Sequence, residues 1–531
     1  MDTDVLIVGA GPTGLMLANQ LARRGVRTLI IDRHAHPARE TRALGVQART
    51  LEIYQKLGVV EQALALGKRG DGANLWADGR RMARVPLADA GSRLSPYPFI
   101  LILGQDDNEK ILGARLREFG LSVDWNTELK AFTQTPGGVV ATLQRADGSL
   151  REVKAAWIAG CDGARSAVRE QSGIGFPGAP YEHVFFVADV EATGEMVPDE
   201  VNVYLWKEGF HLMFPMRGTD HWRLVGILPE ALRGKSDVGF EEVVPAVHAQ
   251  AGKGLVFKAC SWFSTYRIHH RSASHFREGR AFVLGDAAHI HSPLGAQGMN
   301  TGLQDAYNLA WKLALVTRGM ADASLLDSYE AERLPVARRL LDTTDRGFRL
   351  VVSDNWFAGL LRTEVLARVG ALAMSRPRIQ RTAFRTVSQI GIHYRDSALS
   401  TALGGTPEDA PRAGDRFPWV RLRFSPQGPA QDVFAKLDDL HFHLLVFGQD
   451  PPARTGWPAD ELLRVHAVPS APDNDAELDR MRIPRTSFYL LRPDGHVGLS
   501  GVRLDEADVA RYARERLALA GPGAPTSASA S

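Results

Sequence analysis

The stretch from Gly279 to Leu313, GRAFVLGDAAHIHSPLGAQGMNTGLQDAYNLAWKL, is the part of the chain around which the rest is organised. Residues 281–284 form a short apolar run that is typical of a buried strand. Gly285 and Asp286 follow directly, and this pair predicts a turn that leaves a carboxylate at the end of the strand. Such a carboxylate can accept hydrogen bonds from sugar hydroxyl groups.

The loop after this turn is rich in glycine and proline, so its backbone can pass close to a flat ligand. Apolar residues recur at helical spacing from Leu303 to Leu315, and Asn300 or Thr301 is the predicted N-cap. The helix would direct free N–H groups and a partial positive charge towards a ligand in the loop. The structural alternative is an ordinary strand-loop-helix corner. The predicted ligand contacts are Asp286, Pro293, Gly298, Met299 and Asn300.

The N-terminus contains a second pattern of this kind. Residues 4–8 are predicted to form a buried strand, residues 9–14 (GAGPTG) a tight turn, and residues 15–24 a helix. A second strand is predicted over residues 27–31, and it ends at Asp32. A lone G-x-G-x-x-G is weak evidence, but this one lies between two strands and is followed by an acid. The setting therefore strongly indicates dinucleotide binding.

Each glycine of the N-terminal turn has a separate physical role. Gly9 permits the sharp turn, Gly11 lets the backbone approach a pyrophosphate, and Gly14 lets the helix pack closely on the strand. Asp32 can accept hydrogen bonds from the adenosine ribose. The predicted contacts in this region are Gly9, Gly11, Pro12, Thr13, Gly14 and Asp32.

A segment rich in arginine and histidine follows Asp32. Solvated surface explains most of these residues, but the guanidinium of Arg42 lies close enough after the turn to pair with a pyrophosphate. Arg33 could favour the 2′-phosphate of NADPH, although this preference over NADH is weak. Further along, Gln105 and Glu109 lie on one side of a predicted amphipathic helix.

The last part of the first 180 residues contains a third strand-to-helix turn. Residues 139–150 give a clear hairpin signal, with Ala-Asp-Gly-Ser between two alternating runs. A strand over residues 157–159 then leads to GCDGARS at 160–166. Asp162 and Gly163 in this turn provide another place to hold a phosphate or a ribose.

Composition bounds the function. The 531 residues are 44% hydrophobic and 23% charged, which suits two to four globular domains. The net charge is +2, from 63 basic and 61 acidic side chains, so composition gives no case for nucleic acid or an anionic membrane. Cys161 and Cys260 make neither a disulfide framework nor a metal cluster, which fits a cytoplasmic protein.

Two further negative predictions concern targeting and metals. The apolar run near the N-terminus is preceded by Asp2 and Asp4 and interrupted by glycine and proline, so it is not predicted to be a signal peptide. No run approaches the length of a membrane span. His289 and His291 are two apart, but without partner ligands they are predicted to pack in the loop, and no metal is expected.

Together, GAGPTG, GCDGARSAVR and GDAAHIHSPLGAQGMNTG resemble the three flavin motifs of the single-component, FAD-dependent aromatic hydroxylases. This group includes enzymes similar to p-hydroxybenzoate hydroxylase and, more closely, phenol hydroxylase. Gln105 with Glu109 matches the Q-x-x-x-E segment of that family, and residues 329–335 match its helix after the flavin loop. The resemblance covers roughly residues 1–345 and is much more specific for the fold than for the substrate.

The resemblance implies an α/β fold of the glutathione-reductase type: a Rossmann-like FAD domain in two segments, an inserted β-sheet substrate domain, and a C-terminal thioredoxin-like domain. The expected boundaries are FAD-binding segments at 1–180 and 271–345, the substrate domain at 181–270, a helical connection at 346–395, a cysteine-free thioredoxin-like domain at 396–520, and a disordered tail at 521–531.

Four strands predicted between residues 184 and 227 could form the wall of a pocket facing the flavin. The candidate pocket residues are Tyr204, Trp206, His211, Met213, Phe214, Trp222 and, from the glycine-rich loop, Pro293. Core packing is the alternative for each of the aromatic residues.

The implied activity is that of an FAD-dependent monooxygenase with NADPH or NADH as transient electron donor. It would hydroxylate a small aromatic, phenolic substrate with dioxygen through a flavin C(4a)-hydroperoxide. One alternative is Baeyer–Villiger oxidation or hydroxylation of a polyketide-like ring, and another is a flavin-binding redox sensor or scaffold that does not oxygenate. The substrate, any phenol-deprotonating base, and the choice between monomer and homodimer stay open.

Overall fold

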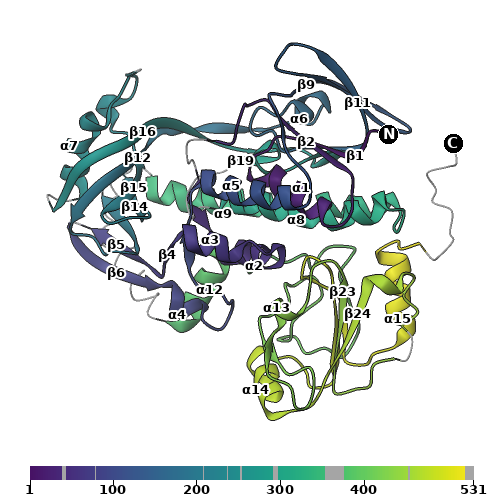
Figure 1. The fold of residues 1–531 in the computed structure, drawn as a ribbon. Coiled ribbons are helices and arrows are strands. Elements are labelled where there is room, and N and C mark those ends of the chain that lie inside the picture. The colour runs from purple at the N-terminus through teal and green to yellow at the C-terminus, as the bar shows by residue number, and fades with distance from the viewer. Residues whose placement is uncertain are drawn as a thin grey trace.

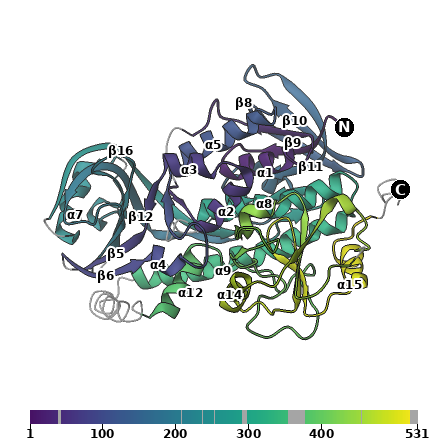
Figure 2. The same cartoon turned by 60° about the horizontal axis from the view of Figure 1, so that its bottom comes forward.

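The computed structural model is a mixed α/β protein built around three large β-sheets (Figures 1 and 2). It describes residues 1–38, 43–77, 79–206, 209–235, 237–251, 254–290, 297–352, 376–452 and 455–520. Two long helices, α8 (Gly298–Thr317) and α9 (Asp327–Val352), cross the centre of Figure 1, with the C-terminal sheet on their lower side.

The first sheet brings the three glycine-rich turns together. Strands β18, β11, β1, β2 and β8 are parallel neighbours in that order, so their carboxyl ends share one edge. The N–H of Cys161 donates to the carbonyl of Val8 at 2.7 Å, and that of Leu284 donates to the carbonyl of Gly160 at 3.0 Å. The strands of this sheet are β1 (Thr3–Val8), β2 (Thr28–Asp32), β8 (Asp124–Trp125), β9 (Glu128–Thr135), β10 (Gly138–Gln144), β11 (Leu150–Gly160), β17 (Arg277–Glu278) and β18 (Ala281–Val283).

The helices that pack on this sheet explain its core. Sixteen of the residues of α8 are buried, because the helix lies between the first sheet and the C-terminal domain. The amphipathic pattern of residues 50–68 predicts one helix, but the structure has two, since Gly58 ends α2 in the left-handed region with φ of 81°. The other helices of this part are α1 (Pro12–Ala22), α2 (Ala48–Leu57), α3 (Val60–Leu66), α4 (Leu87–Gly91), α5 (Gln105–Glu118) and α6 (Ala167–Gln171).

The second sheet lies beside the first, at the left of Figure 1. Its order is β19-β16-β12-β15-β14-β13-β5-β6, and helix α7 (Phe240–Ala251), which the sequence did not predict, covers its outer face. The strands are β5 (Gly72–Ala77), β6 (Arg80–Pro86), β12 (Gly178–Gly194), β13 (Val201–Trp206), β14 (Gly209–Pro215), β15 (His221–Ile227), β16 (Leu255–Ser272) and β19 (His289–Ile290). A small sheet of β3 (Gly45–Val46), β7 (Ile100–Ile102) and β4 (Lys68–Gly70) adjoins it.

The C-terminal domain contains a five-stranded sheet in the order β20-β26-β25-β23-β24. Its strands are β20 (Thr401–Ala402), β23 (Phe442–Phe447), β24 (Leu463–Val468), β25 (Ser487–Leu491) and β26 (Val497–Gly501), with β21 (Arg421–Leu422) and β22 (Gln431–Asp432) forming a separate pair. Its helices are α13 (Val433–Lys436), α14 (Pro472–Met481) and α15 (Glu506–Arg511), and α12 (Pro377–Val387) precedes it. One hydrophobic cluster joins Trp311 and Leu315 of α8 to Phe442 and Leu444 of this sheet.

Most predicted strands are present, with two differences. The sequence of residues 121–127 is typical of a strand, but only β8 forms there. The second sheet includes β5 and β6, which lie outside the expected substrate segment of 181–270. The predicted tail at 521–531 and part of the helical connection at 346–395 lie outside the described residues. Among the described residues, no helix combines the length and the apolar composition needed to cross a membrane.

Candidate FAD site

The turn between β1 and α1 has the geometry predicted from its three glycines. Gly9 has φ of +102°, and a Cβ there would lie 2.4 Å from the carbonyl oxygen of Cys161. A Cβ on Gly14 would lie 1.9 Å from the carbonyl oxygen of Gly9, so helix and strand pack at backbone distance. In contrast, a Cβ on Gly11 would meet no atom within 4 Å. The open side of the turn is therefore at Gly11, where a phosphate can approach.

The N-terminus of α1 suits an anion. Gly11 is the N-cap and Pro12 is in the first turn, which contains no acidic side chain and no side-chain cap. The first backbone N–H groups of a helix lack partners within the helix, and they carry the positive end of its dipole. Thr13 also packs against the last of the three motifs, because a Cβ on Gly285 or Gly302 would lie 2.6 or 2.4 Å from its Oγ1.

Asp32 lies at the carboxyl end of β2, as predicted. One carboxylate oxygen accepts a hydrogen bond from the N–H of Ala10 at 2.7 Å, and the other accepts one from the N–H of His34 at 2.9 Å. These bonds tie the carboxylate to the glycine turn, while its 13% exposure leaves it accessible to a ribose hydroxyl. The neighbouring Arg33 is exposed.

The Q-x-x-x-E segment has a role that the amphipathic pattern did not reveal. Gln105 donates to Glu109 at 2.9 Å, and Glu109 accepts from the N–H of Ala38 at 2.9 Å. The N–H of Gln105 donates to the carbonyl of Ala43 at 3.0 Å. The first turns of α5 thus hold both ends of the segment that contains Arg42, which itself lies outside the described residues.

The middle motif presents a buried carboxylate. One oxygen of Asp162 accepts hydrogen bonds from the N–H groups of Ala167 at 2.7 Å and Val168 at 3.3 Å. The other oxygen is buried without a hydrogen-bond partner in the described part of the chain, and burial raises the pKa of this carboxyl group. Gly163 beside it has φ of +77° and open space around its Cα. A buried polar atom without a partner indicates a place for a ligand group.

Arg169 connects the middle motif to the last one. Its guanidinium donates to the carbonyl of Ala164 at 2.9 Å and to the carbonyl of Ala287 at 2.9 Å, and its side chain is 4% exposed. Asp286, one residue before Ala287, is exposed in a short 3-10 turn at the end of β18. The arrangement places the Asp286 carboxylate at the same sheet edge as the other two motifs.

The start of α8 differs from the prediction. The helix begins at Gly298 with Gln297 as N-cap, so Asn300 and Thr301 lie inside the first turn, and the prediction of either as N-cap is wrong. Asn300 is fully buried; it donates to the carbonyl of Gly45 at 2.8 Å and accepts from the N–H of Gln47 at 2.9 Å. Its amide therefore fixes the segment around Gly45 against α8.

Other predicted contacts lie around this turn. The sulfur of Met299 accepts from the amide of Asn108 at 3.2 Å, and Gly298 is the first residue of α8. Pro293 and His291 lie outside the described residues. His289 bonds to Asp305 at 2.7 Å, and no group of three or more metal-binding side chains occurs among the described residues.

The predicted pocket residues separate onto two faces of the second sheet. Tyr204, His211, Met213 and Trp222 face α7, where they pack with Phe186 in or against one hydrophobic cluster. Their assignment to a pocket wall is therefore a correction, because side chains alternate along a strand and these point away from the first sheet. Burial lowers the pKa of His211 to about 3, as expected for a core imidazole.

Phe214 lies on the opposite, inner face. It packs against the cluster formed by Leu44, Ile100 and Val201, which joins the second sheet to the segment held by Asn300. The other residues of the inner face, which the sequence analysis missed, are Phe185, Val187, Leu205, Phe210, Leu212, Val225, Ile227, Trp262 and Tyr266. The side chain of Trp206 lies outside the described part.

These observations fit a bound dinucleotide. The turn is open at Gly11, the N-terminus of α1 lacks a cap, and Asp162 has a buried oxygen without a partner in the described structure. The family model described as "FAD binding domain" matches residues 2–344.

Known relatives extend over nearly the whole chain. The 6-methylpretetramide 4-monooxygenase of Streptomyces rimosus is 33% identical over 94% of this chain and 91% of its own length. The pentachlorophenol 4-monooxygenase of Sphingobium chlorophenolicum is 32% identical over 79% and 76%. The solved anhydrotetracycline hydroxylase of Streptomyces rimosus superposes with a TM-score of 0.78 and 29% identity over 96% of this chain and 99% of its own.

A crystal structure of aklavinone-11 hydroxylase with FAD and aklavinone gives a TM-score of 0.77, with 26% identity over 97% of this chain and 99% of its own. Fold and site thus define an FAD-dependent monooxygenase. The chain belongs to the FAD binding domain family, and its resemblance to the FAD-dependent aromatic hydroxylases is confirmed.

Replacing Asp286 with alanine is expected to weaken FAD binding by about 1–3 kcal/mol, the usual effect of losing a hydrogen bond to a charged group. Titration of the apoprotein with FAD, followed by quenching of flavin fluorescence, measures this loss. Asp450→Ala, at an exposed position in the C-terminal domain, is the control. Unchanged affinity in Asp286→Ala would contradict the assignment of Asp286 to the cofactor.

Proposed function

We propose that this protein uses NAD(P)H and dioxygen to hydroxylate a phenolic ring of a polycyclic aromatic substrate. The names of two relatives, which act on 6-methylpretetramide and anhydrotetracycline, support a polycyclic substrate. The name of the pentachlorophenol 4-monooxygenase supports a phenolic ring. A complex of one structural neighbour contains aklavinone together with FAD.

The inner face of the second sheet is the observation that carries the proposal. It presents the partly exposed rings of Phe214, Trp262 and Tyr266, an aromatic surface suited to a flat ligand, and Phe185 and Phe210 are buried in the same cluster. Its apolar residues continue through Val201 to Leu44 and Ile100 on the cofactor side. We infer that the substrate lies against this face.

The proposed cofactor contacts are those of the three motifs; Arg42 and Pro293 among them lie outside the described residues. Gly9, Gly11, Pro12, Thr13 and Gly14 would hold the pyrophosphate at the N-terminus of α1, with Arg42 as a further partner. Asp32 would bind the adenosine ribose, and Arg33 the 2′-phosphate of NADPH. Bound FAD would carry electrons from NAD(P)H and activate dioxygen. The remaining proposed contacts are Gln105, Asp162, Gly163, Asp286, Pro293, Gly298, Met299 and Asn300.

The chain's own task is to orient the ring and keep water out. The aromatic inner face would exclude water, and the first turn of α8 would direct N–H groups and positive potential to the flavin.

We propose a structural role for the C-terminal domain. The order β24-β23-β25-β26, with β23 and β24 parallel and the others antiparallel, supports a thioredoxin-like sheet. Both cysteines of the chain, Cys161 and Cys260, lie outside this domain, so it has no thiol chemistry.

The alternatives lead to different products. Baeyer–Villiger oxidation and hydroxylation each add one oxygen atom, but only the former gives a lactone that opens in alkali. A non-oxygenating sensor could oxidise NAD(P)H but would form no oxygenated product. The monooxygenase relatives do not support this alternative.

The test is NAD(P)H oxidation in the presence of a panel of simple phenols, naphthols and four-ring phenols. We expect the polycyclic phenols to stimulate NAD(P)H oxidation at least about tenfold over the substrate-free rate. Each product should contain one additional oxygen atom and should not open in alkali as a lactone does. Parallel assays with NADPH and NADH define the donor. If no phenol changes the rate or gains oxygen, the proposed substrate class is wrong.

A further inference from the structure

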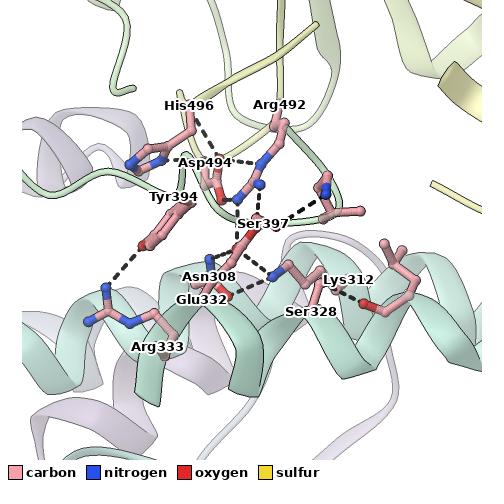
Figure 3. A network of polar contacts seen from close by, with 12 residues as sticks. Asn308, Lys312, Ser328, Glu332, Arg333, Tyr394, Ser397, Arg492, Asp494 and His496 are labelled. Atoms are coloured by element: carbon pink, nitrogen blue, oxygen red, sulfur yellow. Dashed lines mark hydrogen bonds and ion pairs between the residues drawn. The ribbon is translucent and has the colours of Figure 1, made fainter. Parts of the chain in front are cut away.

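A continuous set of buried polar contacts connects the C-terminal domain to the turn that contains Asp286. Its centre is the adjacent pair Glu332 and Arg333 on α9, whose side chains lead to different partners (Figure 3). Glu332 accepts from Arg492 of the C-terminal domain, whereas Arg333 extends towards the first turns of α8.

The carboxylate of Asp305, in the middle of α8, accepts hydrogen bonds from residues on both sides of the turn that contains Asp286. One oxygen accepts from the N–H of Gly285 at 3.1 Å and from the ring of His289 at 2.7 Å. These two residues lie on either side of Asp286 in the sequence. The position of the Asp286 turn therefore depends directly on where Asp305 lies.

Arg333 fixes Asp305 and the start of α8 together. Its Nε donates to the other oxygen of Asp305 at 2.6 Å, and its Nη2 donates to the carbonyl of Thr301 at 3.1 Å. The side chains of both charged residues are 0% exposed. Burial alone would raise the pKa of Asp305, but Arg333 and His289 outweigh this effect and lower it.

Tyr394 brings the C-terminal domain into this set. Its hydroxyl accepts from Arg333 at 3.0 Å, and its ring lies 4.3 Å from that of His496 (Figure 3). Its N–H donates to the carbonyl of Gly414 at 2.8 Å, which anchors it to the C-terminal domain. Gln389 also contacts Thr301, because its amide donates to the hydroxyl of Thr301 at 2.9 Å.

We propose that Asp305 and Arg333 are positioning residues for the flavin and that Tyr394 places this positioning under the influence of the C-terminal domain. None of the three needs to touch the cofactor. They set the relative position of two flavin-contacting parts, the Asp286 turn and the first turn of α8. The structural role proposed for the C-terminal domain then includes the positioning of the flavin site.

The test compares two tyrosine variants in the same region. Tyr394→Phe removes the hydroxyl bonded to Arg333, and Tyr512→Phe removes a buried hydroxyl that donates to the carbonyl of Leu399 at 2.7 Å. Both lose one buried hydrogen bond, so the thermal midpoints of both apoproteins should fall, and that of Tyr394→Phe should fall further because its hydroxyl accepts from a charged guanidinium. Only Tyr394→Phe is expected to weaken FAD binding, by about three- to tenfold, and to shift the reduction potential of bound flavin.

A second pair of variants keeps the test informative. Arg333→Lys retains a charge near Asp305 but cannot make all three hydrogen bonds, whereas Arg333→Met removes the charge. We expect FAD affinity to decrease in the order wild type, lysine, methionine. Equal FAD affinity and flavin potential in wild type, Tyr394→Phe and Tyr512→Phe would overturn the proposal, even if the arginine variants failed to fold.

Discussion

Replacing Arg492 with methionine is expected to destabilise the protein by about 3–5 kcal/mol, the usual effect of removing one partner from a buried ion pair. Arg492 donates to the two oxygens of Glu332 at 2.6 and 2.9 Å and to Asp494 at 2.5 Å. The side chains of all three are at most 2% exposed. Without the guanidinium, Lys312 would be the charged partner left beside the two buried carboxylates, because burial lowers the pKa of His496, the imidazole next to Asp494.

The loss should appear where the C-terminal domain meets α8 and α9, since Glu332 also accepts from Asn308 at 2.7 Å and from Lys312 at 2.8 Å (Figure 3). Urea unfolding gives the free energy, and limited proteolysis reports whether the C-terminal domain separates first. Arg482→Met is the control, because its pair with Asp409 is exposed and should contribute less than about 1 kcal/mol.

A double variant separates the charge effect from lost packing. Glu332→Met combined with Arg492→Met leaves Lys312 and Asp494 with equal and opposite charges, so it should be more stable than either single variant. If the double variant instead loses the sum of the two single losses, the buried charges are not coupled as proposed.

The contribution of Glu332 to the stability of the protein depends on pH. Burial would raise the pKa of Glu332, but Arg492 and Lys312 outweigh it and lower the pKa to about 2 from 4.5. Because the folded-state pKa is depressed, the carboxylate's contribution to stability is present above about pH 4.5 and is lost as pH falls towards 2. The stability difference between wild type and Glu332→Gln should therefore narrow over that range.

Sequence patterns predicted correctly those parts of the fold that depend on residues close together in the sequence. The turn at Gly9 to Gly14 and the acid at Asp32 were predictable because backbone geometry and strand ends depend on neighbours in sequence. Asn300 was misassigned as an N-cap for the opposite reason. Its partners Gly45 and Gln47 lie about 250 residues away, as the separations of 255 and 253 show, and no local signal indicates them.

The pocket wall shows a second limit. Alternation along β13, β14 and β15 predicts two faces, but both faces here are apolar, since α7 covers one and the other meets the cofactor side. Period-2 patterning therefore could not show that Phe214 points inward while Tyr204 and His211 point outward. The burial of Glu332 and Arg492 could not be predicted from the sequence either, because a charged residue considered alone is expected at the solvated surface.

The two glycines Gly11 and Gly14 provide a contrast between binding and folding. A Cβ on Gly14 would lie 1.9 Å from the carbonyl oxygen of Gly9 and 3.3 Å from the Cβ of Cys161. Backbone atoms cannot move aside as a flexible side chain can, so α1 would have to shift away from β1. Gly14→Ala is therefore expected to destabilise the apoprotein by about 1–3 kcal/mol or more, as measured by urea unfolding.

Gly11→Ala should leave the stability of the apoprotein nearly unchanged but weaken FAD binding. Gly11 has φ of −70° and ψ of −177°, which alanine adopts readily, and its Cβ would meet no atom within 4 Å. The stability of the apoprotein should then change by less than about 0.5 kcal/mol. The added methyl group, however, would lie on the open side of the turn, where it would separate the pyrophosphate from the N–H groups of α1. We expect FAD affinity to fall by about 1.5–3 kcal/mol, the value of hydrogen bonds to a charged group.

Gly137→Ala, also without an atom within 4 Å but located at the turn between β9 and β10, is the matched control and should retain both properties. If Gly11→Ala bound FAD as tightly as Gly137→Ala does, the open space at Gly11 would not be the pyrophosphate site. The converse result would also be decisive: if Gly11→Ala unfolded as easily as Gly14→Ala, the turn would require glycine at both positions for folding, and the loss of FAD would follow from the loss of structure.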